Sequence, residues 1–316
     1  MRGDRVDRPQ PTGYWRRGAL GAVTMGAFVS VAAAALLRSR PPGGVERWTR
    51  QNHVGRPVTL FEGPAYAVGA AAGALAGGAG GPAVVAGLGA AAFGAVDDLA
   101  GDGSSKGLRG HFAAARRGEL TTGVIKVLGL GVTGLLSAWM IDRSRERSGL
   151  VATVVGGGVI AGSANIANLL DLRPGRALKV VLLVAAPIVA ADVGTGRSRT
   201  TSSAAAAAAA GAALGLLPDD LAGRTMMGDT GSNSAGALLG AALVARSGSR
   251  GRFAALAAVT FLTLASERVS FTKVIESTPG LRELDGLGRP PRVSPDLPPP
   301  VFPVSPPRVS SASPPK

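Results

Sequence analysis

Apolar residues occur in long blocks along this chain, with little of the amphipathic periodicity that surface helices show. Nine blocks predict membrane helices: residues 18–37, 65–81, 82–96, 124–141, 149–164, 177–193, 203–217, 232–245 and 253–265. A membrane helix needs about 20 apolar residues, in a range of roughly 17–25, so the shorter blocks must extend into their flanks. The alternative, a soluble domain with buried helices, leaves little amphipathic surface to meet water. We therefore expect an all-α, polytopic transmembrane helix bundle of about nine helices.

The two ends of the chain differ from this central part. Residues 279–316 repeat paired prolines among Ser and Arg, a composition that cannot bury a core. We expect this segment to be a disordered Pro-rich tail, residues 1–17 a flexible N-terminus, and residues 18–278 the transmembrane domain. The first block is long for a signal peptide and is followed by further blocks, so we expect it to be retained as a helix.

Composition and charge exclude several classes of protein. The chain has no Cys, which excludes disulfides, thiolate nucleophiles and cysteine zinc sites. Its two histidines, His53 and His111, lie far apart. The net charge of +14 is carried mainly by loops and tails, which favours membrane orientation and attraction to anionic lipids. The arginines are dispersed and few aromatics accompany them, so we expect membrane lipids, and no nucleic acid, among the partners.

Polar groups with catalytic chemistry stand at the ends of the apolar blocks. In chain order they are Asp97 and Asp98 after the third block, Lys126 at the start of the fourth, Asn168 and Asp171 after the fifth, and Asp229 before the eighth. If the blocks alternate across the membrane, these groups share one face with the loop that holds His53 and Arg56. Arginines in the early loops favour the cytoplasm for this face of a multi-pass cell-membrane protein. An arginine cluster at residues 143–147, in a loop on the opposite face, favours the reverse orientation.

Each of these groups also has a structural explanation. Thr230 or Ser232 could cap a helix, Asp97 and Asp98 could be solvated helix ends, and Lys126 could extend to the interface. Against this, a charged Asp in the bilayer costs about 2.5–3.5 kcal/mol on insertion scales. Acidic sites that converge on one face repel one another unless a cation bridges them. Oxygen ligands without Cys indicate a hard cation, and we expect Mg²⁺.

The ordered set of motifs resembles the polyprenyl-phosphate N-acetylhexosamine-1-phosphate transferase superfamily (glycosyltransferase family 4), which includes the phospho-N-acetylmuramoyl-pentapeptide transferases. The resemblance runs from about His53 to Lys273, and the Met227-Gly-Asp-Thr-Gly-Ser232 element is its most specific part. The loop from His53 to Thr59 is similar to a basic, proline-containing loop of that family.

The resemblance implies a transferase that moves a sugar-1-phosphate from a UDP-sugar to polyprenyl phosphate and releases UMP, in envelope polysaccharide or peptidoglycan precursor synthesis. A homodimer is left open. The implied roles are a Mg²⁺ ligand at Asp229, catalytic groups at Asp97, Asp98 and Lys126, and substrate-binding groups at His53, Arg56, Asn168 and Asp171. Phosphoryl transfer needs charge neutralisation and in-line positioning more than covalent help, which suits such a set.

The chain departs from the family pattern after Asp171, where Arg173 and Arg176 replace a second carboxylate. Guanidinium groups pair bidentately with phosphates and carboxylates. We expect both to bind the donor diphosphate, an acidic sugar or Asp171, with lipid headgroups as the alternative partners. A late His-rich loop of the family is replaced by residues 267–276, and no apolar block follows it.

Two other classes stay open. A transporter would use membrane carboxylates to carry ions, but its charges should lie near the middle of helices rather than at their ends. A catalytically silent relative would act as a scaffold in envelope assembly and would keep the fold without binding a metal.

Overall fold

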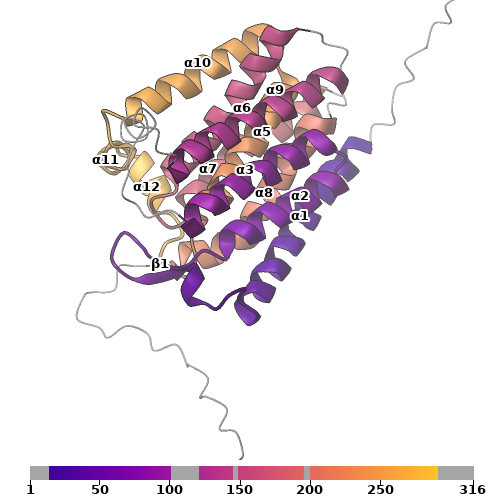
Figure 1. The fold of residues 1–316 in the computed structure, drawn as a ribbon. Helices are drawn as coiled ribbons and strands as arrows, with labels where there is room; N and C mark the ends of the chain where they lie inside the picture. The colour runs from indigo at the N-terminus through magenta and orange to yellow at the C-terminus, as the bar shows by residue number, and fades with distance from the viewer. Residues whose placement is uncertain (1–13, 101–120, 145–148, 196–199, 291–316) are drawn as a thin grey trace, which may run out of the picture.

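The structure is a computed structural model that describes residues 14–100, 121–144, 149–195 and 200–290. These residues form a bundle of packed helices, as the predicted all-α class requires (Figure 1). The long helices are α1 (Tyr14–Ser39), α2 (Glu62–Ala76), α3 (Gly81–Ala100), α5 (Thr122–Ser144), α6 (Leu150–Leu170), α7 (Arg176–Thr195), α8 (Thr200–Leu221), α9 (Gly228–Arg246) and α10 (Ser249–Ser266). A 3-10 turn, η1 (Glu46–Trp48), and a hairpin of β1 (Thr49–Gln51) and β2 (Pro57–Thr59) join α1 to α2. Two short helices, α11 (Phe271–Ser277) and α12 (Leu281–Gly286), follow α10.

Within the described residues, five helical stretches are long and apolar enough to cross a membrane: Gly18–Ser39, Gly81–Ala100, Thr122–Ser144, Leu150–Leu170 and Thr201–Leu221. α10 and α11 meet at a 91° bend and make a sixth if they are counted together. The predicted number of nine spans is therefore not confirmed, although each predicted block falls largely in a helix. α2 has 15 residues, fewer than the roughly 17 that a span needs. α9 begins with a polar turn and is buried among other helices.

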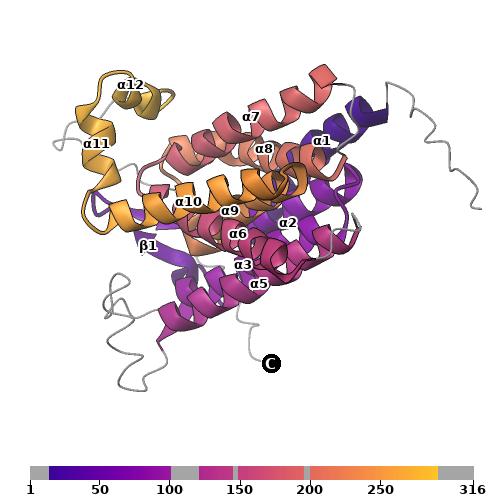
Figure 2. The same ribbon diagram turned by 90° about the horizontal axis from the view of Figure 1, so that it is seen from above.

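α9 is the central helix of the bundle. It packs against α2, α3, α6 and α8, and almost all of its side chains are buried (Figure 2). Gly236 allows the close approach to α6, because a β-carbon there would lie 2.2 Å from the carbonyl oxygen of Ser163. Small residues spaced four apart permit such backbone contact in membrane helices. Gly236 therefore lets the backbones of α9 and α6 pack in direct contact.

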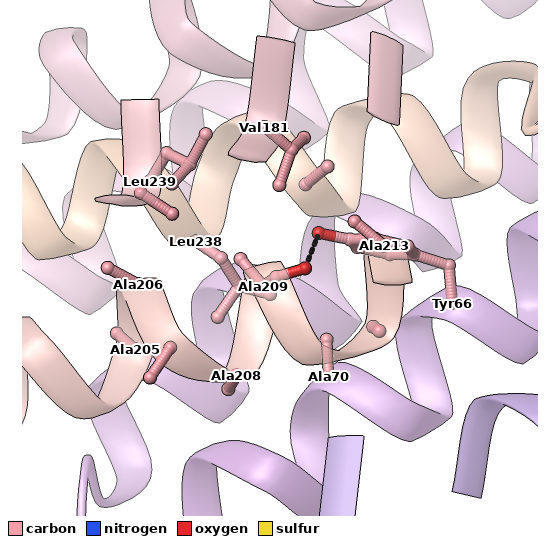
Figure 3. Close-up of a cluster of buried hydrophobic side chains, with 14 of the residues drawn as sticks. Tyr66, Ala70, Val181, Ala205, Ala206, Ala208, Ala209, Ala213, Leu238 and Leu239 are labelled. Atoms are coloured by element: carbon pink, nitrogen blue, oxygen red, sulfur yellow. Dashed lines mark hydrogen bonds between the residues drawn. The ribbon is translucent and has the colours of Figure 1, made fainter. Parts of the chain in front are cut away.

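The alanine-rich segment of α8 forms much of the core. Residues Ala204 to Ala209 are all buried, and α8 contacts α1, α2, α7 and α9. Figure 3 shows the phenol of Tyr66 donating a hydrogen bond to the carbonyl oxygen of Ala209, at 3.0 Å. A buried Tyr hydroxyl needs such a partner, and this bond joins α2 to α8.

The outer helices present large apolar side chains to their surroundings. Examples are Phe28 on α1, Leu128 and Val132 on α5, and Phe261 and Leu264 on α10. Contiguous exposed apolar surface is unusual for a protein in water. Together with the apolar length of the helices, it indicates a membrane protein.

The hairpin, α11 and α12 lie at one end of the bundle (Figures 1 and 2). In the hairpin, Thr49 pairs with Thr59, and Thr59 also forms a parallel bridge to Thr225 just before α9. The side-chain oxygen of Asn52 accepts the N–H groups of Val54 and Arg56 and closes the turn. The hairpin is thus fastened to the segment that leads into the central helix.

The expected boundaries at the chain ends differ from the structure. α1 begins at Tyr14, inside the segment predicted to be flexible, and α12 lies inside the predicted disordered tail. α12 is held by an ion pair between Asp285 and Arg176, a long-range contact that proline content does not reveal. The rest of both predicted segments, residues 1–13 and 291–316, lies outside the described residues, as does His111.

Candidate active site

Four helix ends meet at the end of the bundle that carries the hairpin. α3 and α6 end there, α5 and α9 begin there, and α9 contacts the other three. Asp98 and Asn168 belong to the helices that end, and Lys126 and Asp229 to those that begin. These motifs lie at one end of the molecule, as the alternation of apolar blocks predicted.

Asp98 caps α9 from a neighbouring helix. Its Oδ1 accepts the backbone N–H of Asp229 at 3.0 Å. Its Oδ2 accepts the N–H of Thr230 at 2.8 Å and the hydroxyl of the same residue at 2.6 Å. The residue at the usual cap position, Met227, makes no side-chain capping bond. A carboxylate at this place satisfies free N–H groups and complements the helix dipole. The capping role considered for Thr230 and Ser232 thus belongs to Asp98.

Lys126 forms an ion pair with Asp229, and both side chains are mostly buried, with exposed fractions of 12% and 19%. The carboxyl group of Asp97 is in hydrogen-bond contact with that of Asp229. Two carboxyl groups this close can share a proton or hold a cation between them. The approach depends on Gly94, where a β-carbon would lie 2.3 Å from the carbonyl oxygen of Asp229. These contacts put two carboxylates and one ammonium group in a single cluster.

Asn168 contacts the first turn of α9 through Ser232. The buried Ser232 hydroxyl lies 2.7 Å from the carbonyl oxygen of Gly228 and 3.2 Å from the side-chain oxygen of Asn168. The end of α6 and the start of α9 are therefore joined by side-chain contacts. In this arrangement Asn168 supports the position of α9.

A cavity of about 280 Å³ opens beside this cluster, between the hairpin and the end of α6. It is lined by Gln51, Asn52, His53, Val58, Asp171, Leu172, Arg173, Pro174, Asp220, Gly223, Thr225 and Met226. Three predicted substrate-binding residues, His53, Asp171 and Arg173, are among them. At the rim, the guanidinium of Arg173 also pairs with Glu276 of α11 at 3.2 Å.

Asp171 connects the cavity to the acidic cluster. Burial raises the pKa of its carboxyl well above the ordinary value, and the negative charges of Asp220, Asp229 and Asp98 raise this pKa further. A hydrogen bond from the backbone N–H of Gly228 opposes the shift. The buried Oδ2 atom of Asp171 has no hydrogen-bond partner in the described part of the chain.

Two predicted substrate-binding residues lie elsewhere. Arg56 is exposed in the hairpin turn and does not line the cavity. Arg176 is 3% exposed, and its guanidinium binds both carboxylate oxygens of Asp285 at 2.8 and 2.9 Å and the hydroxyl of Thr272 at 2.9 Å. The partner of Arg176 is therefore α12, rather than Asp171 or a lipid headgroup as the sequence suggested.

Three acidic residues near the site were not singled out from the sequence. Asp220 lines the cavity, Glu62 is bonded to the cavity residue Thr225, and Asp285 holds Arg176. Asp220 follows Asp219 at the end of an apolar block, the same signal that marked Asp97 and Asp98. Glu62 lies just before an apolar block and offered a weaker signal. Asp285 carried none, because it lies in a polar, proline-flanked segment.

Carboxyl groups of the acidic cluster are the side chains that the structure offers to the predicted Mg²⁺. Among the described residues no group of three or more His, Cys, Asp or Glu side chains is arranged to hold a metal. Mg²⁺ is, however, commonly bound by one or two carboxylates together with substrate phosphates and water. The Asp97 and Asp229 carboxyl groups supply such a pair, with Lys126 beside them.

No protein-family model matches the sequence, and no curated protein matches it.

Proposed function

We propose that this protein is an integral membrane transferase that moves a sugar-1-phosphate from a UDP-sugar to polyprenyl phosphate and releases UMP. The observation that carries the proposal is the cluster of Asp97, Asp229 and Lys126 at one end of an apolar helix bundle, beside a cavity of about 280 Å³. A lipid-linked phosphate and a water-soluble nucleotide sugar can meet only where membrane helices end. The motif order described above is the second support.

The proposed reaction is a phosphoryl transfer. An oxygen of the lipid phosphate attacks the sugar-linked phosphorus of the donor, and the bond from that phosphorus to the UMP oxygen breaks. A phosphate monoester has a second pKa near about 6 and is largely ionised at neutral pH, so a strong base is not essential. The product is a lipid diphosphate sugar for envelope polysaccharide or peptidoglycan synthesis.

Each side chain of the site has a separate role in the proposed reaction. Asp97 and Asp229 would hold Mg²⁺, which when bound neutralises charge on the donor diphosphate. Lys126, now paired with Asp229, would place its ammonium against a phosphate. Asp98 fixes the start of α9 through three hydrogen bonds, so its role is to position Asp229. His53, Asp171 and Arg173 line the cavity in which the donor would bind.

The proposed localisation is the cell membrane, where the lipid-linked acceptor resides. We place the site end of the bundle at the cytoplasmic face of the cell membrane. Early loops rich in arginine and the topology implied by the resemblance support this orientation.

The decisive experiment is an assay of UMP release. Purified full-length protein is incubated with polyprenyl phosphate, Mg²⁺ and a panel of UDP-sugars. We expect Mg²⁺-dependent release that falls by orders of magnitude in Asp229→Asn and Asp97→Asn, in protein that thermal unfolding shows to be folded. Asp219→Asn is the matched control, because Asp219 lies at the same end but pairs with Arg38 and Arg224 at the surface. No release with any donor, or full activity in Asp229→Asn, would refute the proposal and leave a transporter or a silent scaffold as the remaining classes.

A further inference from the structure

The cavity beside the acidic cluster has more carboxyl groups than guanidinium groups in its lining. Two carboxylates line it, those of Asp171 and Asp220, and Asp220 is only 2% exposed. One oxygen of Asp220 accepts the backbone N–H of Gly175 at 2.9 Å. The buried Oδ2 of Asp171 has no such donor in the described part of the chain. The cavity wall therefore offers more acceptors than the protein satisfies.

A third carboxylate lies directly behind this wall. Glu62 is 1% exposed, and its Oε2 accepts the hydroxyl of Thr225 at 2.6 Å, while Thr225 itself lines the cavity. The other oxygen, Oε1, is buried with no hydrogen-bond partner among the residues that the structure describes. A buried carboxylate without partners is costly, and like charges at close range add to the cost. Burial, and then the negative charge of Asp220, raise the pKa of Glu62, and a ligand that supplies donors and positive charge would favour its ionised form.

The nearby cationic side chains have partners of their own, and one of them, Arg173, also lines the cavity. Lys179 donates to the backbone carbonyl oxygens of Leu284 in α12 and of Leu287 just after it, both at 3.1 Å. Arg289 donates to Asp285 and to the carbonyl oxygen of Pro174. Arg173 pairs with Glu276 at the rim. None of these hydrogen bonds reaches the unpaired oxygens of Glu62 or Asp171.

We propose that this cavity binds a protonated amine, and that the donor is a UDP-sugar whose amino group is not acetylated. The identification of the ligand as a donor sugar rests on the proposed function; the affinity for an amine does not. An ammonium group has three N–H donors and can reach separate carboxylates. The volume, about 280 Å³, is close to the lower end of small-molecule sites, roughly 300–1,000 Å³, and exceeds the need of a bare ion. Gln51, Asn52 and His53 supply polar groups for the sugar hydroxyls.

Calorimetric titration of the full-length protein in detergent tests the proposal. The probes are glucosamine-1-phosphate, N-acetylglucosamine-1-phosphate and glucose-1-phosphate, each without added metal. Because hydrogen bonds to charged groups are strong, we expect glucosamine-1-phosphate to bind at least about tenfold more tightly than the other two. Asp220→Asn and Glu62→Gln keep side-chain volume and an acceptor oxygen, and should abolish this preference. Asp219→Asn, at the neighbouring surface residue, should retain it.

Several results would overturn the proposal. Equal binding of the three probes by the wild-type protein would do so, as would loss of the preference in Asp219→Asn. Binding of MgCl₂ or NaCl alone that disappears in Asp220→Asn, with no preference for the amine, would instead identify an inorganic cation site. Thermal unfolding of each variant verifies that it is folded. Asp220→Asn and Glu62→Gln each remove one carboxylate, so the proposal is tested at two independent positions.

UMP release separates this inference from the proposed function. Transfer from UDP-N-acetylglucosamine at least as fast as from UDP-glucosamine would support the transferase and refute a donor sugar with a free amino group. A preference for the amine in binding, with no transfer from any donor, would retain the subsite and refute the transferase.

Discussion

At the scale of single residues, Asp98 and Asp229 are close in space but have different tasks. Both oxygens of Asp98 are used by donors from the first residues of α9. Asp229 contacts the ammonium of Lys126 and the carboxyl of Asp97. The carboxylate of Asp98 binds backbone N–H groups, and that of Asp229 contacts ionisable side chains. Substitutions at these two positions should therefore affect different properties.

Asp98→Asn should lower stability as well as turnover. An asparagine has one acceptor oxygen and cannot take the place of both carboxylate oxygens, so a backbone N–H at the start of α9 loses its partner. An unsatisfied buried donor costs about 1–3 kcal/mol, which should appear as a lower thermal unfolding temperature. Asp229→Asn leaves the hydrogen bonds of Asp98 to α9 in place, so it should lose turnover with a smaller change in unfolding temperature than Asp98→Asn. If Asp98→Asn unfolds at the wild-type temperature, the capping role is wrong.

At the scale of elements, the geometry of the site depends on how closely α3 approaches the start of α9. Gly94 is the point of closest approach, where an added β-carbon would lie 2.3 Å from the carbonyl oxygen of Asp229. Gly94→Ala should push the two helices apart and separate Asp97 from Asp229. We expect a loss of Mg²⁺-dependent turnover of at least about 100-fold, because small displacements of reacting groups have effects of that size.

Gly131→Ala in α5 is the control for this experiment. A β-carbon at Gly131 meets no atom within 4 Å, and alanine has a higher helix propensity than glycine. Its activity should equal that of the wild type. Equal activity in Gly94→Ala would show that the site tolerates a wider separation of α3 and α9.

α12 is held to the start of α7 by a buried pair of Arg176 and Asp285. Asp285→Asn leaves the guanidinium without its counter-charge, at a cost of up to roughly 3–5 kcal/mol. We expect faster cleavage near α12 in limited proteolysis. Glu283→Gln, in the same helix but at the surface, keeps an acceptor oxygen for the N–H of Gly280 that Glu283 caps, and should be cleaved like the wild type. Equal cleavage of both variants would show that the pair of Arg176 and Asp285 does not hold α12 in place.

The pH dependence of the Arg176–Asp285 pair follows from the same contacts. Burial opposes ionisation of Asp285, but hydrogen bonds from Arg176 and Arg289 outweigh it and lower its pKa to about 2. A lowered pKa gives stability that is present above the unfolded value near about 3.9 and is lost as the pH falls through about 2. Resistance to cleavage at α12 should therefore be constant from about pH 5 to about pH 8.

At the scale of the whole molecule, helix directions decide which loops share a face. The hairpin turn and the loop between α8 and α9 lie at the site end, and the turn between α9 and α10 lies at the other end. Single cysteines at the exposed residues Val54 and Ala222 should react with an impermeant reagent from the cytoplasmic side. A cysteine at the exposed Ser249 should react from the opposite side.

The absence of native Cys makes this labelling specific. Labelling of Val54→Cys and Ala222→Cys from opposite faces would exclude a single site at one end. Labelling of all three from one face would show that α9 does not run across the membrane.

The sequence by itself determined where the helices lie and which polar groups stand at their ends. A long apolar block, buried or facing lipid, satisfies its backbone hydrogen bonds as a helix. The alternation of these blocks along the chain placed Asp98, Lys126, Asn168 and Asp229 at one end. These properties follow from order along the chain. The sequence also shows an acidic end to α8, but only the structure shows that Asp220 at this end lines the cavity.

Only the tertiary structure decided which side chains meet. The rotation of α3 about its axis assigns Asp98 to the α9 backbone and Asp97 to the cluster. The return of α12 to α7 gives Arg176 a partner 109 residues away. The fold of α2 against the segment before α9 brings Glu62 behind the cavity. Such contacts depend on packing between helices distant in sequence, for which local hydrophobic patterns carry no information.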